Sequence, residues 1–153
     1  MKKLLLFLLI PTAAFSQHKL TLYFEGFTPH VGQPLFIRVI EKARAVEVGR
    51  QYYPVITDPA FDIDLYVLIA GNSYQIDYYA DLNLNGEYDA PPTDRAWRTE
   101  VGPVSGDTEM TLTHNTNFTD IQFPAPLSMV DLVDDYSGKW INPTFSVEDN
   151  VRW

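Results

Sequence analysis

The sequence contains no cysteine. Disulfide frameworks, thiolate metal sites, cysteine nucleophiles and lipid attachment to a leader cysteine are therefore excluded. Basic residues are also few, because 11 Lys and Arg stand against 20 Asp and Glu, which gives a formal net charge of -9. A protein that follows a nucleic-acid backbone needs a basic face, so this balance argues against nucleic-acid binding. An acidic chain is better suited to cations or to an exported surface.

Sequence patterns typical of catalysis are scarce as well. The chain has neither the serine elbow G-x-S-x-G nor the glycine patterns of nucleotide-binding loops. Two carboxylate pairs are poor candidates for acid–base work. Asp62 and Asp64 alternate with core residues, and Asp134 and Asp135 lie late in a predicted helix, where the helix dipole disfavours them. We therefore expect a protein that is not an enzyme.

Only the N-terminus carries a continuous apolar run, and it resembles a secretory signal. Lys2 and Lys3 form a positive start, residues 4–10 are apolar, and residues 14–16 (Ala-Phe-Ser) have the small-x-small pattern of a cleavage site. An apolar run of this length is too short to span a bilayer as a helix, and no later stretch is long enough. We expect a signal peptide over residues 1–16, cleavage near Ser16, and a secreted or periplasmic mature chain without a membrane span.

After the leader, apolar and polar residues mostly alternate with period two, which is typical of half-buried strands. Strands are predicted over residues 18–25, 35–40, 61–69 and 74–79, with weaker ones over residues 45–53, 97–101, 109–114 and 118–123. Turn residues such as Val31-Gly32 and Gly71-Asn72 separate these segments. Short strands at this spacing predict an all-β fold, an immunoglobulin-like or transthyretin-like antiparallel β-sandwich, with a small barrel as the alternative.

The last 30 residues have a different pattern. We expect the sandwich domain to occupy residues 17–123 and a proline-led tail to occupy residues 124–153. Apolar residues in the tail recur with helical spacing: Met129, Leu132, Val133 and Tyr136. With Ser128 as N-cap and Gly138 as stop, this spacing predicts a short amphipathic helix over residues 128–137.

Residues 81–89, with the sequence D-L-N-L-N-G-E-Y-D, carry the one pattern with recognisable chemistry. The segment resembles the first nine positions of an EF-hand-type calcium loop. In such loops, oxygens at positions 1, 3 and 5 converge on the ion, glycine at 6 permits a sharp turn, and positions 7 and 9 complete the shell. The predicted ligands are the side chains of Asp81, Asn83, Asn85 and Asp89 and the backbone carbonyl of Glu87.

Two departures separate this segment from a true EF-hand. Position 12 is Pro92, so the bidentate glutamate is missing, and the flanks are a predicted strand and a proline-rich segment instead of two helices. A carboxylate from elsewhere, Asp94 or Asp77, would have to complete the shell, and the expected dissociation constant is about 0.1–1 mM, as in extracellular modules. Asn85-Gly86 is also a preferred hairpin turn, so a plain turn without metal, or a different cation, is the alternative.

A resemblance to a group of proteins rests on this same region. Residues 71–98, with the pattern Y-x-I-D-Y-Y-A-D-x-N-x-N-G-x-Y-D-A-P-P, resemble uncharacterised exported bacterial β-sandwich proteins of the immunoglobulin-like or transthyretin-like kind. In those proteins a strand runs directly into a D-x-N-x-N-G-x-x-D loop. The resemblance implies the sandwich fold and export, and it implies no activity.

The three histidines suggest a second chemistry. His30 and His114, together with an acidic group, could bind copper, zinc or iron, because neutral imidazoles suit those metals. No local spacing such as H-x-H supports such a site. To share one ion, the two side chains would have to lie within about 5 Å of each other. The alternative is that these are ordinary loop histidines.

Aromatic residues suggest a third possibility, a sugar-stacking or protein-docking strip. The candidates are Tyr52, Tyr53, Tyr79, Trp97 and Trp140. Such residues also pack inside sandwiches, which is the alternative.

Taken together, these features predict an exported β-sandwich that acts as a binding or accessory module with an unidentified protein or glycan partner. Calcium would have a structural role. The alternatives are a periplasmic transition-metal-handling protein that uses His30 and His114, and a carbohydrate-binding module.

Overall fold

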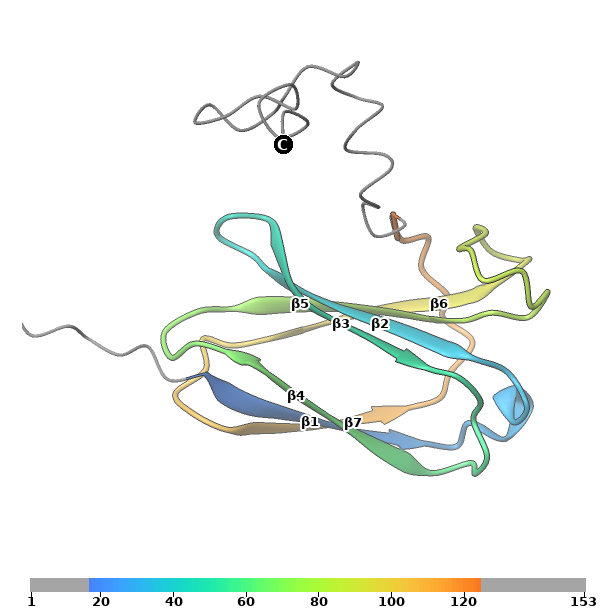
Figure 1. The fold of residues 1–153 in the computed structure, drawn as a ribbon, viewed down its shortest axis with the longest axis horizontal. Helices are drawn as coiled ribbons and strands as arrows, with labels where there is room; N and C mark the ends of the chain where they lie inside the picture. Colours follow the sequence, from blue (N-terminus) through green and yellow to red (C-terminus); the bar gives the residue numbers. More distant parts are fainter. Residues whose placement is uncertain (1–16, 125–153) are drawn as a thin grey trace, which may run out of the picture. The chain divides into compact units, whose positions relative to one another are not determined.

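The computed structural model describes residues 17–124, which form two β-sheets stacked face to face (Figure 1). The strands are β1 (His18–Glu25), β2 (Leu35–Glu41), β3 (Val46–Tyr53), β4 (Phe61–Leu68), β5 (Tyr74–Ala80), β6 (Arg95–Val101) and β7 (Thr108–Thr113). A single 3-10 turn, η1 (Thr28–His30), follows β1. The predicted all-β sandwich is thus confirmed. The predicted leader at residues 1–16 and helix at residues 128–137 lie outside the described residues.

The order of the strands within each sheet differs from their order along the sequence. One sheet has the order β4-β1-β7 and the other has the order β3-β2-β5-β6. All neighbours pair antiparallel except β1 and β7, which are parallel, with Glu25 opposite Thr113 at their ends. The first and the last strand along the sequence of the domain therefore end next to each other.

The core lies between the sheets and consists of the apolar residues that alternate along the strands. In β1, Leu20, Leu22 and Phe24 are at most 1% exposed, and in β5, Ile76 and Tyr78 are at most 4% exposed. Because successive side chains of a strand point to opposite faces, the period-two pattern places one apolar row inside. Burial of these rows, at about 25 cal/mol per Å² of apolar surface, is the main term that stabilises the domain.

The eighth predicted strand, residues 118–123, is wrong. No strand forms within residues 114–124, and Thr119 donates its backbone N–H to the Ala96 carbonyl of β6. Its apolar residues have another use, because Ile121 is 2% exposed and Phe118 packs edge-on against the Trp97 ring. The alternation of this segment reflects packing against the side of the sandwich instead of a ladder.

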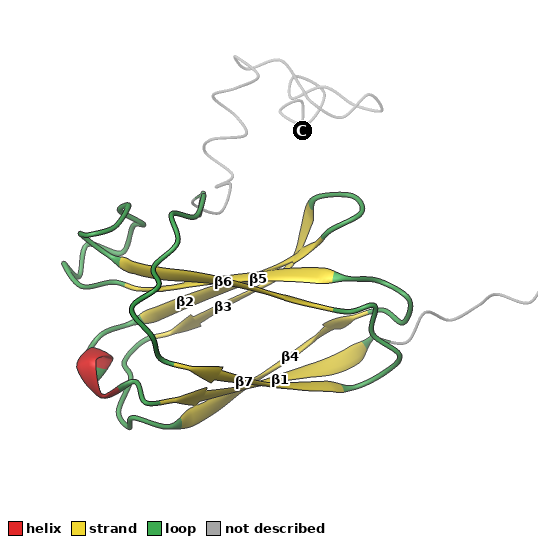
Figure 2. Cartoon of the chain, turned by 180° about the vertical axis from the view of Figure 1, so that it is seen from behind, coloured by secondary structure: helices red, strands yellow, loops and turns green. Residues whose placement is uncertain are grey.

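One end of the sandwich collects the long connections. The loops after β1, β3 and β5 and the segment after β7 all leave the strands at the end where η1 lies (Figures 1 and 2). Loops held on a rigid scaffold are the usual place for binding chemistry, so this end is where a site is expected. Within residues 17–124 there is also no helix of the length and hydrophobicity that crossing a bilayer requires.

Candidate functional site

Asp81 organises the loop between β5 and β6. Its carboxylate is buried, with the residue 1% exposed, and it accepts hydrogen bonds from the N–H of Leu84 (2.7 Å) and the N–H of Gly86 (2.9 Å). Gly86 has a φ of 80°, the left-handed conformation that glycine adopts without strain. The first and sixth positions of the predicted calcium pattern therefore make the sharp turn that the sequence analysis expects.

Three further predicted ligands converge within the same loop. The side-chain amides of Asn83 and Asn85 donate to one oxygen of Asp89, at 2.8 and 2.9 Å. Their amide oxygens accept backbone N–H groups, Asn83 from Asn85 and Asn85 from Glu87. The side chains at positions 3, 5 and 9 thus point into the same space, whereas Glu87 contacts Asn85 through its N–H.

Asp94 supplies the additional carboxylate at this loop. It is 0% exposed and accepts hydrogen bonds from the N–H of Leu82 (3.0 Å) and the N–H of Asp89 (2.8 Å). Burial raises the pKa of Asp94, and the negative charges of Asp81 and Asp89 act in the same direction, against these two hydrogen bonds. The loop therefore holds three carboxylates that repel one another.

The donor set of this loop suits a hard cation, but its atoms are not gathered around one point. Residues 81–94 contain four carboxylates, two asparagines and no Lys or Arg, and calcium takes six to eight oxygen ligands. However, in the described range 17–124 no three His, Asp or Glu side chains are grouped so that they could hold a metal ion. The N–H groups of Asn83 and Asn85 face Asp89, so calcium would require both amides to turn an oxygen toward the shared space.

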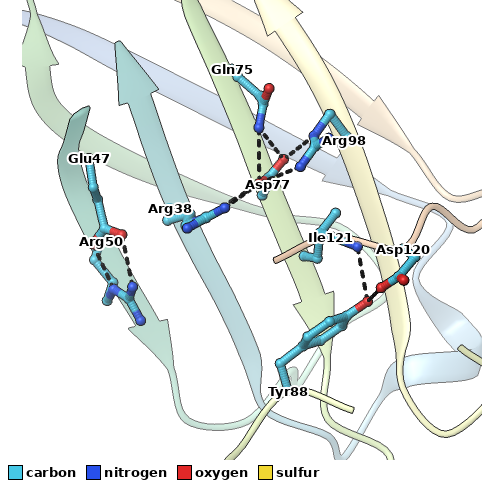
Figure 3. A network of polar contacts seen from close by, with 9 residues as sticks. All are labelled: Arg38, Glu47, Arg50, Gln75, Asp77, Tyr88, Arg98, Asp120 and Ile121. Carbon is cyan, nitrogen blue, oxygen red and sulfur yellow. Dashed lines mark hydrogen bonds and ion pairs between the residues drawn. The ribbon is translucent and has the colours of Figure 1, made fainter. Parts of the chain in front are cut away.

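Tyr88 fastens the loop to the segment after β7 (Figure 3). Its hydroxyl donates to Asp120 Oδ1 (2.9 Å) and accepts from the N–H of Ile121 (3.1 Å). Burial is the main cause that raises the pKa of Tyr88 to about 12. The loop is consequently anchored at its eighth residue.

Asp77, the other carboxylate considered for calcium, belongs to a separate network (Figure 3). It is 0% exposed and accepts from the guanidinium groups of Arg38 (3.0 Å) and Arg98 (2.7 Å) and from the amide of Gln75 (3.1 Å). Two positive charges already compensate this carboxylate. Asp77 therefore belongs to a buried ion-pair network formed by β2, β5 and β6.

The two histidines singled out in the sequence meet at the same end of the sandwich. Their Nε2 atoms are 3.2 Å apart, so the proximity that a shared metal ion demands is present. The parallel pairing of β1 with β7 explains the meeting, because His30 follows β1 in η1 and His114 directly follows β7. A hydrogen bond from the N–H of His114 to the Glu25 carbonyl (2.8 Å) holds this crossing.

Aromatic rings surround the histidine pair. The Trp97 ring lies 5.4 Å from that of His30 and 5.8 Å from that of His114, and Phe27 contacts both imidazoles at similar distances. His30 is 3% exposed, whereas His114 is half-buried. Burial lowers the pKa of His30, the charges of His114 and Arg95 act in the same direction, and the hydrogen bond to Gln33 opposes them.

Gln33 and Arg95 are the residues of this cluster that sequence reasoning missed. Gln33 Oε1 lies 2.8 Å from His30 Nδ1, and its position three residues after a histidine is the one local signal for this contact. Arg95 directly follows Asp94, and no sequence pattern relates it to His30. His18 lies elsewhere, at the start of β1, with its Nδ1 3.5 Å from Asp107.

The predicted aromatic strip is divided between core and surface. Tyr52 is 51% exposed and Tyr53 is half-buried, whereas Tyr79 and Trp97 are buried, and Trp140 lies outside the described residues. An open groove of about 420 Å³ lies where β6 and β7 face each other, and threonine and asparagine side chains line much of it. Trp97 thus packs as a core residue, at the boundary between the groove and the histidine pair.

Comparisons of the chain with protein-family models, with curated proteins and with solved structures give no match.

Proposed function

We propose that this chain is an exported β-sandwich that acts as a binding or accessory module, with residues 81–94 held in place by one calcium ion. The observation that carries the proposal is the convergence of Asn83, Asn85 and Asp89 in a loop whose first residue, Asp81, already binds the N–H of Gly86. Carboxylate and amide oxygens at these positions are the ligands that calcium prefers.

Calcium would have a structural role in this loop. Asp81, Asp89 and Asp94 would be its carboxylate ligands, and Asn83 and Asn85 would contribute amide oxygens after rotation of their side chains. Without a cation, the mutual repulsion of the three carboxylates raises the free energy of the folded loop. A divalent ion that neutralises this repulsion stabilises the folded state. Rotation of the two amides costs their contacts to Asp89 and the hydrogen bonds that their oxygens accept from backbone N–H groups.

The strand order supports a transthyretin-like type of sandwich over an immunoglobulin-like one. Immunoglobulin domains place strands A, B, E and D in one sheet, so their first and second strands share a sheet. Here β1 pairs with β4 and β7, and β2 pairs with β3 and β5. The first two strands therefore lie in different sheets, which leaves the transthyretin-like type as our proposal.

The mature chain is proposed to be exported and to bind a protein or glycan partner. The signal-like pattern of residues 1–16 supports export of the mature chain to the periplasm or out of the cell, where calcium is abundant. The absence of a recognisable nucleophile motif favours a binding role over catalysis, with a protein or glycan as the partner class.

Thermal unfolding of the mature chain tests the calcium loop. With excess EGTA and then about 5 mM CaCl₂, a site with a dissociation constant of about 0.5 mM gains about 1.4 kcal/mol in the free energy of unfolding. For a chain of this size, that gain raises the melting temperature by roughly 5–6 °C.

Two variants and a charge-matched control accompany this measurement. The double variant Asp81→Ala, Asp89→Ala and the milder Asp89→Asn should abolish or reduce the calcium-dependent rise. Asp62→Asn removes the same charge from an exposed strand position and should retain it. An unchanged melting temperature in the unsubstituted chain would overturn the proposal and leave the loop as a plain turn.

A further inference from the structure

We propose that His30 and His114 provide two nitrogen ligands of a site for a divalent transition-metal ion, Cu²⁺ or Zn²⁺. This site goes beyond the proposed calcium loop, because its ligands are imidazoles and not oxygens. It lies between η1 and the end of β7, where the two imidazoles face each other through their Nε2 atoms.

The separation of the two nitrogens fits shared coordination. Bonds of about 2.0–2.1 Å at a tetrahedral angle place two nitrogen ligands about 3.3–3.4 Å apart. The observed Nε2–Nε2 distance is 3.2 Å. The distance between the two nitrogens would therefore change by only about 0.1–0.2 Å on binding, which keeps this part of the cost of organising the site low.

Gln33 selects the tautomer of His30 that a metal requires. The amide oxygen of Gln33 is an acceptor, so the neighbouring Nδ1 of His30 carries the proton and donates across 2.8 Å. The lone pair of a neutral His30 is then on Nε2, the atom that faces His114. A carbonyl-type oxygen that binds the far nitrogen is the usual support of a metal-bound histidine.

The surroundings leave part of the coordination sphere to solvent. His30 is buried, but His114 is half-buried, and no third His, Asp or Glu joins the pair among residues 17–124. Water or an external ligand would fill the other positions, as at open metal sites. Arg95 lies close enough to lower the pKa of His30, so its positive charge reduces the affinity for a cation.

A hydrogen bond between two neutral imidazoles would also produce this distance, and copper binding separates the two explanations. The mature chain is titrated with Cu²⁺, and tryptophan fluorescence and the electron paramagnetic resonance spectrum are recorded. Because Trp97 contacts both imidazoles, bound Cu²⁺ should quench its emission up to one equivalent. The spectrum should show nitrogen ligands. Zn²⁺ should compete and reverse the quenching.

Variants assign the site. His114→Asn and His30→Asn should weaken binding by at least about 100-fold, and Gln33→Ala by about 10- to 100-fold, because it removes only the supporting hydrogen bond. Arg95→Gln should tighten binding, because it removes a nearby positive charge. Cooperative thermal unfolding of each variant shows that the fold is intact.

His18→Asn is the matched control. Cleavage near Ser16 would leave His18 beside a free amine, and that amino terminus can itself bind copper. Binding that survives His18→Asn and disappears in His114→Asn supports the proposal. Binding that disappears in His18→Asn, binding that persists in His114→Asn, or no saturable binding at all would overturn it.

Discussion

At the scale of single residues, the two ion-pair partners of Asp77 differ in solvent exposure. Asp77 is fully buried and is shared by two guanidinium groups, of which Arg38 has a side chain 11% exposed and Arg98 one 35% exposed. A buried charge that loses its partner costs far more than an exposed one, because water cannot replace the lost interaction. The two arginines should therefore differ in importance.

Substitution of Asp77 should lower the free energy of unfolding more than substitution of Arg98. Asp77→Asn removes the buried carboxylate that two guanidinium groups share and should lower the free energy of unfolding by about 3 kcal/mol, measured by urea denaturation. Arg98→Gln leaves Asp77 paired with Arg38 and should cost less than about 1 kcal/mol. Equal costs for the two variants would contradict the assignment of the buried pair to Arg38 and Asp77.

At the scale of elements, the two sheets approach closely along one side. β3 and β4 are edge strands of different sheets, and Gly49 of β3 lies against Val67 of β4. A Cβ at position 49 would stand 2.5 Å from Val67 Cγ1, closer than nonbonded carbons approach. The missing side chain lets the sandwich close here, whereas β6 and β7 on the other side leave a groove.

The close contact between Gly49 and Val67 predicts how substitutions there change the stability of the domain. Gly49→Ala should destabilise the domain by about 1–3 kcal/mol, because an added methyl group overpacks the interface between the sheets. Adding Val67→Ala should recover part of that loss, so that the double variant is more stable than the sum of the single effects. Gly106→Ala is the control and should be nearly neutral, because a Cβ added at position 106 would have no atom within 4 Å apart from those of its chain neighbours. Additive effects of the pair would rule out the proposed clash.

At the scale of the whole molecule, both proposed cation sites share one end of the sandwich (Figure 2). The calcium loop ends at Asp94, and the next residue, Arg95, already acts electrostatically on His30. A positive ion bound at one site should therefore disfavour a positive ion at the other. Thermodynamic linkage makes the effect reciprocal.

Copper titrations with and without calcium measure this coupling. About 5 mM CaCl₂ should weaken Cu²⁺ binding by about two- to tenfold, and saturating Cu²⁺ should weaken Ca²⁺ binding by the same factor. The variant Asp89→Asn should lose most of the effect, because it weakens calcium binding. Tighter copper binding in calcium would show that repulsion between the ions is not what couples the sites.

The sequence by itself determined the strands, the acidic loop and the candidate residues at both sites. Alternation of apolar and polar residues is a local property of the chain, so it predicted four of the seven strands of residues 17–124 clearly and the other three weakly. Asn83, Asn85 and Asp89 are close enough in sequence for spacing to bring them together. The same local reasoning mistook residues 118–123 for a strand, because a strand also needs a partner edge.

Only the tertiary structure decided the contacts between distant segments. His30 and His114 meet because β1 and β7 pair in parallel, and no local pattern reports which strands become neighbours. The same is true of Asp77, which alternation places on an outer face and which pairs there with Arg38 and Arg98 from the two neighbouring strands. Spacing along the chain determines what a loop can bind, whereas strand pairing determines which loops act together.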